Sequence, residues 1–448
     1  MSRQFDSNYL TGLLQLQSSL NETAYGEFIL TPFPMPPSAI EVIGLVVIMV
    51  LMILCNAGGV GGGGNSTPFI VVFFNLTLIE CIPIGNFLGF ISAFFRFIIN
   101  YREKHPNNPD KLAIDYEIIE LTMPLLYLGT LFGVQIGTRL PEIYLAVIFA
   151  ILLFFVAYKT SEKAYKMIKD ENKKLQISKE DQLSYNDKTL ALKTSLLEKE
   201  SNTVGKNDHE RQNQLENKDE KQSAQLRYIM KQESQHFTPR RCLNFALTLI
   251  FLITTSMLLN SKDIFTVSDY VKYAAVGLFI VYSIGCTIVI SKTLQKNYHI
   301  KLNEGYQFDK NDITYENPGQ LIKVIVLCFI SGILGGIVGI SGGIILAPLF
   351  IQLGMLPTLV SSTNQYLALI STISVSFQYW YLGMLNTEFV IVLGIICMIG
   401  CYIGVKQVQV MVKKSGRQSI IVVALAFVLF ASFLMIPVKY WLKSIGQQ

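Results

Sequence analysis

Two glycine-rich stretches, GGVGGGGNSTPFIVVFF (58–74) and VGISGGIILAPLFIQLG (338–354), share a pattern of glycines followed by a proline and an apolar run. At an offset of 280, Gly62 pairs with Gly342 and Pro68 pairs with Pro348. Each stretch lies between apolar runs, and glycines at this density interrupt a helix. The sequence therefore predicts two broken helices in equivalent places of two related halves.

The repeat continues beyond both stretches. Asn86 pairs with Asn364, and the G-x-x-x-G pattern that begins at Gly133 pairs with the one that begins at Gly400. Matches that follow in the same order favour a duplicated unit over chance similarity. Taken alone, each G-x-x-x-G pattern is better explained by close helix packing.

The composition indicates a membrane protein. Of the 448 residues 51% are hydrophobic and only 15% are charged, whereas a typical soluble domain has about 25% charged residues. A membrane-spanning helix needs about 20 mostly apolar residues. The predicted spans are 39–57, 81–101, 119–138, 142–159, 242–260, 270–291, 321–340, 358–382, 387–405 and 419–441. We therefore expect an all-α, polytopic, multi-pass integral membrane protein.

The chain divides into seven predicted parts. They are a polar N-terminal tail (1–38), a first transmembrane repeat (39–159), a cytoplasmic polar insert (160–240), two linking transmembrane helices (241–291), a cytoplasmic loop (292–320), a second transmembrane repeat (321–441) and a C-terminal tail (442–448). The insert is rich in Lys, Glu, Gln, Asn and Ser, a composition typical of disorder or of short exposed helices.

Positive charge at the ends of the insert sets the predicted orientation. Lys159 and Arg241 flank the insert, so the positive-inside rule places it in the cytoplasm. The loop with Lys413 is expected on the same side, which requires the short apolar segment 343–356 to cross the membrane as well. Each half then has about five helical segments and an odd number of crossings. We therefore predict two inverted repeats, with the N-terminus outside.

Several classes of function lack support in the sequence. There is no P-loop, no Ser/His/Asp set and no metal-ligand spacing, and the seven cysteines form no CxxC pair. The net charge of +5 comes mainly from the mixed-sign insert and not from a basic stripe. We therefore expect a protein that is not an enzyme and has no cofactor, metal or nucleic-acid partner.

The paired breaks are the predicted binding site. Glycine-interrupted helices in corresponding places of two repeats mark the substrate site of many transporters. A broken helix exposes backbone N–H groups and a helix N-terminus, and both attract anions. Thr67, just before Pro68, is expected to cap the helix that follows the first break. The predicted substrate-binding residues are Gly61, Gly62, Gly63, Gly64, Thr67, Asn86, Gly342, Gly343, Ser361, Thr363 and Asn364. For any one polar side chain, an ordinary helix–helix hydrogen bond is the alternative.

Two ionisable residues in the predicted spans need an explanation. Glu80 is the candidate coupling acid for a proton or sodium ion, because an acid inside the membrane often marks function. The alternative is a glutamate at the membrane interface. Arg96 lies close to the polar loop after Tyr101, and we interpret it as a side chain that reaches toward the interface.

With these residues identified, the chain resembles the sulfite exporter TauE/SafE family of membrane proteins. The resemblance rests on GGVGGGGNSTP (58–68) and GILGGIVGISGGIILAP (332–348), and it continues into SSTNQYLALIST (361–372). It covers about 39–159 and 321–441, but neither the N-terminal tail nor the insert.

The resemblance implies a secondary transporter that moves small anions by alternating access, with sulfite, sulfonates and related sulfur compounds as the typical substrates. Its partners would be the anion, the lipid bilayer and a coupling ion. The alternative function is a non-transporting membrane scaffold or trafficking protein that binds soluble partners through the insert at 160–240.

Overall fold

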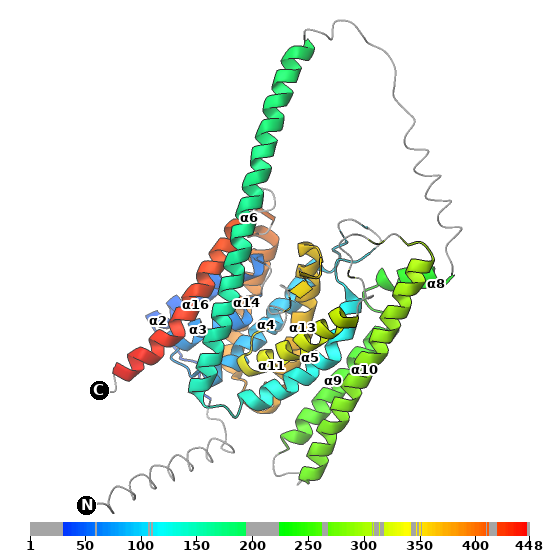
Figure 1. The fold of residues 1–448 in the computed structure, drawn as a ribbon. Helices are drawn as coiled ribbons and strands as arrows, with labels where there is room; N and C mark the ends of the chain where they lie inside the picture. The colour runs from blue at the N-terminus through cyan, green and yellow to red at the C-terminus, as the bar shows by residue number, and fades with distance from the viewer. Residues whose placement is uncertain are drawn as a thin grey trace, which may run out of the picture.

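The computed structural model describes residues 30–445 except 59–60, 106–107, 109–110, 194–223, 262–267, 307, 309–312, 314–317, 342–345, 347–348, 351, 409 and 412–418. Over these ranges the chain is a bundle of α-helices with no β-strand, and one long helix, α6, extends beyond the bundle (Figure 1). The prediction of an all-α fold is confirmed.

Nine of the described helices are long and apolar enough to span a membrane. They are α2 (Ala39–Ala57), α4 (Leu78–Asn100), α5 (Tyr116–Gly137), α6 (Glu142–Lys193), α9 (Pro239–Leu259), α10 (Asp269–Asn303), α11 (Pro318–Val338), α14 (Thr387–Tyr402, continued by the π-helix η1, Ile403–Val408) and α16 (Ser419–Ile445). The tenth predicted span, α13 (Pro357–Tyr381), is equally long but carries many polar side chains.

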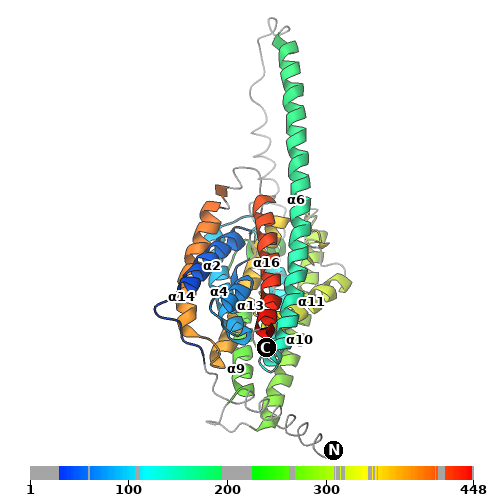
Figure 2. The ribbon, with the colours of Figure 1, turned by 90° about the vertical axis from the view of Figure 1, so that its left-hand side faces the viewer.

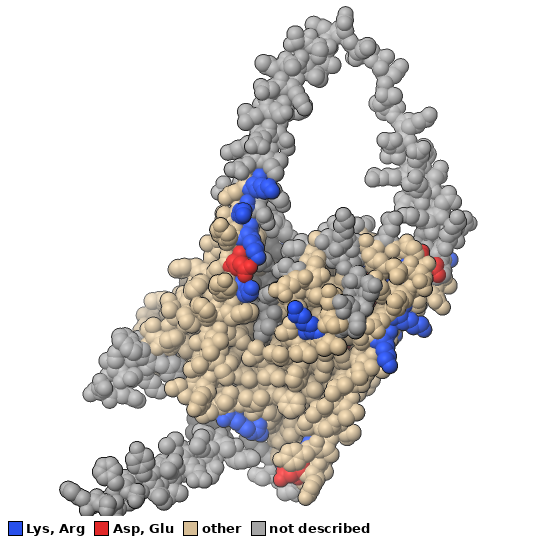
Figure 3. All heavy atoms as spheres, viewed as in Figure 1, with Lys and Arg blue, Asp and Glu red and all other residues tan. Residues whose placement is uncertain are grey.

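The outer surface of the bundle is apolar. Many large hydrophobic side chains of α2, α9, α10 and α16 are exposed, among them Val281 at 70% and Phe427 at 75%. A band without charged side chains crosses the face shown in Figure 3. A helical surface of this kind suits contact with lipid tails rather than water. The protein is therefore an integral, multi-pass membrane protein.

Local sequence determines where the helices begin. Ser38 and Glu41 form a capping box at the start of α2, in which the Ser38 side chain accepts from the backbone of Glu41 and the Glu41 side chain accepts from the backbone of Ser38. Thr238 caps α9, whose first residue is proline. These caps satisfy N–H groups that a helix cannot pair within itself.

Helices in equivalent places of the two halves pack against each other in opposite directions. On α4 and α13, Asn86 contacts Thr372 whereas Asn100 contacts Gln365, so the chain directions are antiparallel. On α6 and α16, Phe154 lies against Phe433 whereas Glu171 accepts from Ser419. Figures 1 and 2 both show α6 and α16 side by side. This is the relation that two inverted halves require, and the inverted repeat itself stays a prediction.

The G-x-x-x-G helices pack across the two halves. A Cβ built on Gly133 of α5 would lie 2.2 Å from the Ile333 carbonyl oxygen of α11, and one on Gly404 of η1 would lie 2.5 Å from the Ile53 carbonyl oxygen of α2. Only glycine permits backbones this close. The interpretation of these patterns as packing motifs is confirmed, and each joins a late helix of one half to the first helix of the other.

One end of the bundle, which we call the insert end, gathers the start of α5, the end of α4, the start of α9 and the start of α13. His236, in front of α9, stacks on Tyr101 with ring centroids 4.0 Å apart and shares a 2.8 Å hydrogen bond with Tyr116. The Thr363 hydroxyl of α13 accepts from the Asp115 N–H. α11 runs parallel to α5 and so begins at this same end, where α13 begins as well. That the segment 343–356 crosses the membrane stays a prediction.

The insert is more structured at its ends than its composition suggested. α6 continues without a break to Lys193, well beyond the predicted boundary at residue 159. The helix α8 (Ala224–Glu233) buries Leu226 and Ile229, and Glu233 forms an ion pair with Lys301 of α10. Because Leu226 and Ile229 share one helical face, α8 packs on the bundle instead of lying free in solvent.

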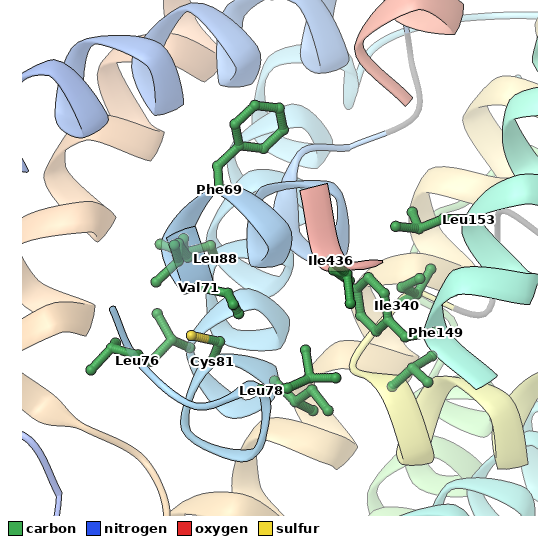
Figure 4. Packing of buried hydrophobic residues seen from close by; sticks show 14 of the residues in the cluster. Phe69, Val71, Leu76, Leu78, Cys81, Leu88, Phe149, Leu153, Ile340 and Ile436 are labelled. Carbon is green, nitrogen blue, oxygen red and sulfur yellow. The ribbon is translucent and has the colours of Figure 1, made fainter. Parts of the chain in front are cut away.

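The main apolar core surrounds the short helix α3 (Gly63–Phe73). Figure 4 shows part of it: Leu78 and Cys81 of α4, Ile340 of the second break and Ile436 of α16. α3 is therefore held between elements of both halves.

Candidate functional site

The two glycine breaks meet inside the bundle. A Cβ built on Gly64 would lie 2.5 Å from Ile340 Cγ1, so the first break packs directly on the second. Gly339 has a φ of +67° and approaches the Ile82 carbonyl and the Asn86 side chain of α4. The glycines are required here because a side chain at either position would collide with its neighbours. In this conformation Ile340, which is 1% exposed, fills the junction.

Glycines also bring α3 onto α4. A Cβ on Gly63 would lie 2.3 Å from the Gly89 backbone, and one on Gly85 would lie 2.2 Å from the Thr67 hydroxyl oxygen. Of the four predicted residues, Gly64 therefore meets the second break, Gly61 and Gly63 lie beside α4, and Gly62 packs on α2. Gly342 and Gly343 lie outside the described residues.

The prediction that Thr67 caps a helix is wrong. α3 begins at Gly63 with Gly62 as its N-cap, and the Gly62 carbonyl accepts from the Ser66 N–H at 3.1 Å, so Thr67 lies inside the helix. Glycine can adopt helical backbone angles despite its low helix propensity, and α3 starts within the glycine run. The Thr67 hydroxyl is buried, and no hydrogen-bond partner for it occurs among the described residues.

Asn86 joins the two central helices. Its amide donates to the Thr372 carbonyl at 3.1 Å and to the Ser376 hydroxyl at 2.8 Å. Nearby, the hydroxyls of Thr130 and Ser374 lie 3.1 Å apart. The polar side chains of α13 therefore face inward, toward α4 and α5, and give the centre of an otherwise apolar bundle a polar stripe. Its buried members are Ser362, Thr363, Gln365, Ser371, Thr372, Ser374, Ser376 and Gln378.

The other predicted polar residues of α13 lie away from the junction. Ser361 is exposed, and Thr363 bonds to Asp115 at the insert end. Asn364 precedes Thr372 by eight residues, about 12 Å along a helix. The structure thus brings Gly61–Gly64, Thr67 and Asn86 together but does not bring Ser361, Thr363 or Asn364 to them. The cause is the antiparallel packing of α4 on α13, which sets Asn86 and Asn364 near opposite ends.

Glu80 has a full set of hydrogen bonds at the other end of the bundle. Its carboxylate accepts from the N–H and hydroxyl of Thr31 at 3.2 and 2.7 Å, and from the N–H and hydroxyl of Thr77 at 2.9 and 2.7 Å. With Thr77 it forms the capping box of α4. This geometry favours the interfacial interpretation over ion coupling.

The prediction that the Arg96 side chain of α4 reaches toward the interface is wrong. The side chain is buried, at 4% exposure, and it forms no hydrogen bond or ion pair with any described residue. Its Nη1 lies 3.8 Å from the position of a Cβ on Gly61. One signal was available: Arg96 follows Gly85 and Gly89 at helical spacing, and that face of α4 meets α3.

A pocket at the insert end is lined by charged residues of both signs. Lys301 pairs with Glu233 and lies 4.0 Å from Glu117, and Lys111 lies 3.7 Å from Glu233. Burial lowers the pKa of nearby His236, which favours its neutral form. Because acids balance the cations, this pocket presents no excess positive charge to an anion. Among the described residues, no group of His, Cys, Asp and Glu is arranged to hold a metal.

Comparisons with known proteins agree with this architecture. Residues 231–434 match the model of the family "Sulfite exporter TauE/SafE". No solved structure gives a significant match.

Curated relatives extend the match over most of the chain. Sulfite exporter TauE/SafE family protein 5 of Arabidopsis thaliana is 26% identical over 96% of this chain and 88% of its own length. Family proteins 2 and 1 of the same plant are 23% and 22% identical, over 85% and 96% of this chain and 79% and 90% of their own lengths. Over most of its length the chain is therefore similar to proteins of the sulfite exporter TauE/SafE family.

Proposed function

We propose that this protein is a secondary transporter that moves a small anion of the sulfite or sulfonate class by alternating access. The observation that carries the proposal is the junction of the two breaks, where Gly64 packs on Ile340 and Gly339 packs on Asn86. Substrate sites of repeat-built transporters lie where broken helices of the two repeats meet. The sulfur-anion class follows from the names of the matching family and relatives.

The first break supplies donors suited to an anion. α3 begins without a side-chain cap, so the N–H groups of Gly63 and Gly64 in its first turn have no partner within the helix. Together with the helix dipole, such groups stabilise negative charge. In the proposal, Gly61 to Gly64 hold the anion, and Gly342 and Gly343 do so from the second half. Thr67 and Asn86 orient it.

The polar stripe of α13 supports a path through the bundle. Thr363 belongs to this stripe at the insert end, and Ser361 and Asn364 are its sequence neighbours; there they would contact the anion during entry or exit. Ile340 closes the junction in this conformation, so transport requires the halves to move apart there. The antiparallel pairs α4/α13 and α6/α16 provide the surfaces for this movement. Glu80 is a candidate coupling acid only if its hydrogen bonds to Thr31 and Thr77 are released during the cycle.

Uptake into proteoliposomes tests the proposal. Purified protein is reconstituted and the initial uptake of radiolabelled sulfite, methanesulfonate and chloride is compared with that of protein-free vesicles. The proposal predicts saturable uptake of sulfite or methanesulfonate that exceeds chloride uptake. Uptake equal to that of empty vesicles for both sulfur anions would contradict it. If the insert then captured a soluble partner, the scaffold function would be favoured instead.

A further inference from the structure

Arg96 is a buried cation without a counter-ion among the described residues. The guanidinium is charged at all physiological pH values, and the Nε atom is buried with no acceptor. Proteins almost always pair a buried charge, because desolvation of an isolated one is costly. The titratable groups around it are Cys55, Cys401 and Glu103. The two thiols are neutral, and Glu103 is an exposed residue that accepts from Ser362 instead.

The neighbours of Arg96 beside the first break are neutral and mostly polar. Gly61, with a φ of +77°, turns the chain next to the Arg96 Nη1 and the Ser92 hydroxyl. Ser92 donates to the Asn56 side chain at 2.5 Å, which ties the end of α2 to α4. Cys401 of α14 approaches the Ser92 carbonyl on another side. Arg96 is thus a single fixed cation beside neutral residues of α2, α4 and α14.

We propose that Arg96 is the fixed cation that binds the transported anion at the first break, an inference that rests on the proposed function. The planar guanidinium donates two parallel N–H groups and so matches an anion with several oxygens on one atom, such as a sulfonate or sulfite. A halide is a single acceptor atom, so it cannot offer a separate acceptor to each of the two parallel N–H groups. Arg96 therefore selects oxyanions over chloride, and the amide groups of the glycine break complete the site.

The position of Arg96 along α4 also indicates from which side of the membrane the anion would reach it. Arg96 lies four residues before Asn100, where α4 ends at the insert end. The positive-inside rule places that end in the cytoplasm. Arg96 thus lies on the cytoplasmic side of the junction at Gly64 and Ile340 in this orientation.

Binding and transport are measured on the same variants of the full-length protein. Arg96→Gln removes the charge, and Arg96→Lys keeps the charge but not the planar fork. Arg139→Gln is the matched control. The Arg139 side chain is exposed, and its hydrogen bonds within the described residues go to Gln135. The Tm of the detergent-solubilised protein is followed with increasing sodium methanesulfonate or sodium sulfite, at an ionic strength held constant with sodium chloride.

We expect methanesulfonate or sulfite to raise the Tm of the wild type and of Arg139→Gln. Arg96→Gln should lose this shift, and Arg96→Lys should need an anion concentration at least about tenfold higher. In proteoliposomes the same Arg96→Lys change should raise the KM for uptake more than it lowers the maximal rate. A purely structural arginine would lower the Tm without changing its response to the anion.

The outcomes separate the two proposals. An unchanged anion response and KM in Arg96→Lys and Arg96→Gln would overturn the role of Arg96 and leave the transport function standing. An Arg96-dependent Tm shift without any uptake by the wild type would support the binding site and contradict transport. A wild type with neither response would contradict both. If Arg96→Gln does not fold, Arg96→Lys alone decides between the first two outcomes.

Discussion

The Asn86 amide donates a 2.8 Å hydrogen bond to the Ser376 hydroxyl, and this contact joins the central helices of the two halves. Asn86 is 1% exposed and lies next to Gly339 of the second break. The Asn86 side chain of α4 therefore contacts both α13 and the second glycine break, which precedes α13 in the chain. These contacts hold the two halves together next to the proposed anion site.

Replacing Asn86 with alanine should destabilise the protein. The change removes the bonds to Thr372 and Ser376 and leaves the Ser376 hydroxyl buried without its donor, which costs about 1–3 kcal/mol. We expect a lower Tm in detergent. Ser376→Ala removes only one of the two bonds and should have a smaller effect. Equal Tm values for wild type and Asn86→Ala would show that this contact does not hold the halves together.

Replacing Gly64 with alanine should abolish transport. The added Cβ would lie 2.5 Å from Ile340 Cγ1 and 2.9 Å from Ile340 Cα, so the breaks must separate. Ile340→Ala in the same chain removes the first clash and should restore part of the uptake. Gly285→Ala is the control, because nothing lies within 4 Å of a Cβ there. Full activity of the Gly64→Ala single variant would mean that the junction is not tightly packed in the working protein.

Replacing Glu80 with glutamine should affect stability and not the pH dependence of uptake. A neutral amide can accept through only one oxygen, so two of the four bonds to Thr31 and Thr77 are lost. The expected loss is about 1–2 kcal/mol, comparable to the loss of a helix cap. Uptake is measured from pH 5.5 to 8 in both proteins. A pH profile that becomes flat in Glu80→Gln would instead identify Glu80 as the coupling acid.

Replacing Glu233 with glutamine should release α8 from the bundle. The change removes the closer acidic partner of Lys301, which is 5% exposed, and leaves only Glu117 at 4.0 Å. Trypsin should then cut more rapidly at Arg227 and Lys231 of α8. The pair Glu233→Lys with Lys301→Glu should slow the cleavage again. Glu162→Gln is the control, because its ion pairs with Lys159 and Lys166 lie on the surface of α6. Unchanged cleavage in Glu233→Gln would show that apolar contacts alone hold α8.

The helices were predictable because hydropathy is a property of the sequence alone. The span predicted at 39–57 coincides with α2, and the other spans agree within a few residues at most ends. The main exceptions are the extra turns of α6 and α10, which run into polar sequence. Those turns are stabilised by helix propensity and by contacts such as Lys301 with Glu233, and a hydropathy window does not detect either.

The candidate site was predicted only in part, because its residues meet through the packing of distant helices. The repeat located both breaks in the sequence, and the structure packs Gly64 of the first on Ile340 of the second. Arg96 was interpreted as reaching toward the interface because it lies close to the polar loop in the sequence. In the fold, however, its side chain faces α3. Ser361 and Asn364 were grouped with Asn86 by sequence similarity, but the antiparallel helices hold equivalent residues apart. Sequence similarity identifies residues at equivalent positions of the two halves, but such residues need not lie close together in the fold.

Counterflow measures the central claim most directly. Proteoliposomes loaded with unlabelled sulfite are diluted into a trace of radiolabelled sulfite, with no other gradient present. A carrier that exposes one site to alternate sides must accumulate the labelled anion transiently above its external concentration, and Gly64→Ala should abolish that accumulation. Labelled sulfite that only reaches equilibrium, or stays at the level of empty vesicles, would contradict alternating access at the paired glycine breaks.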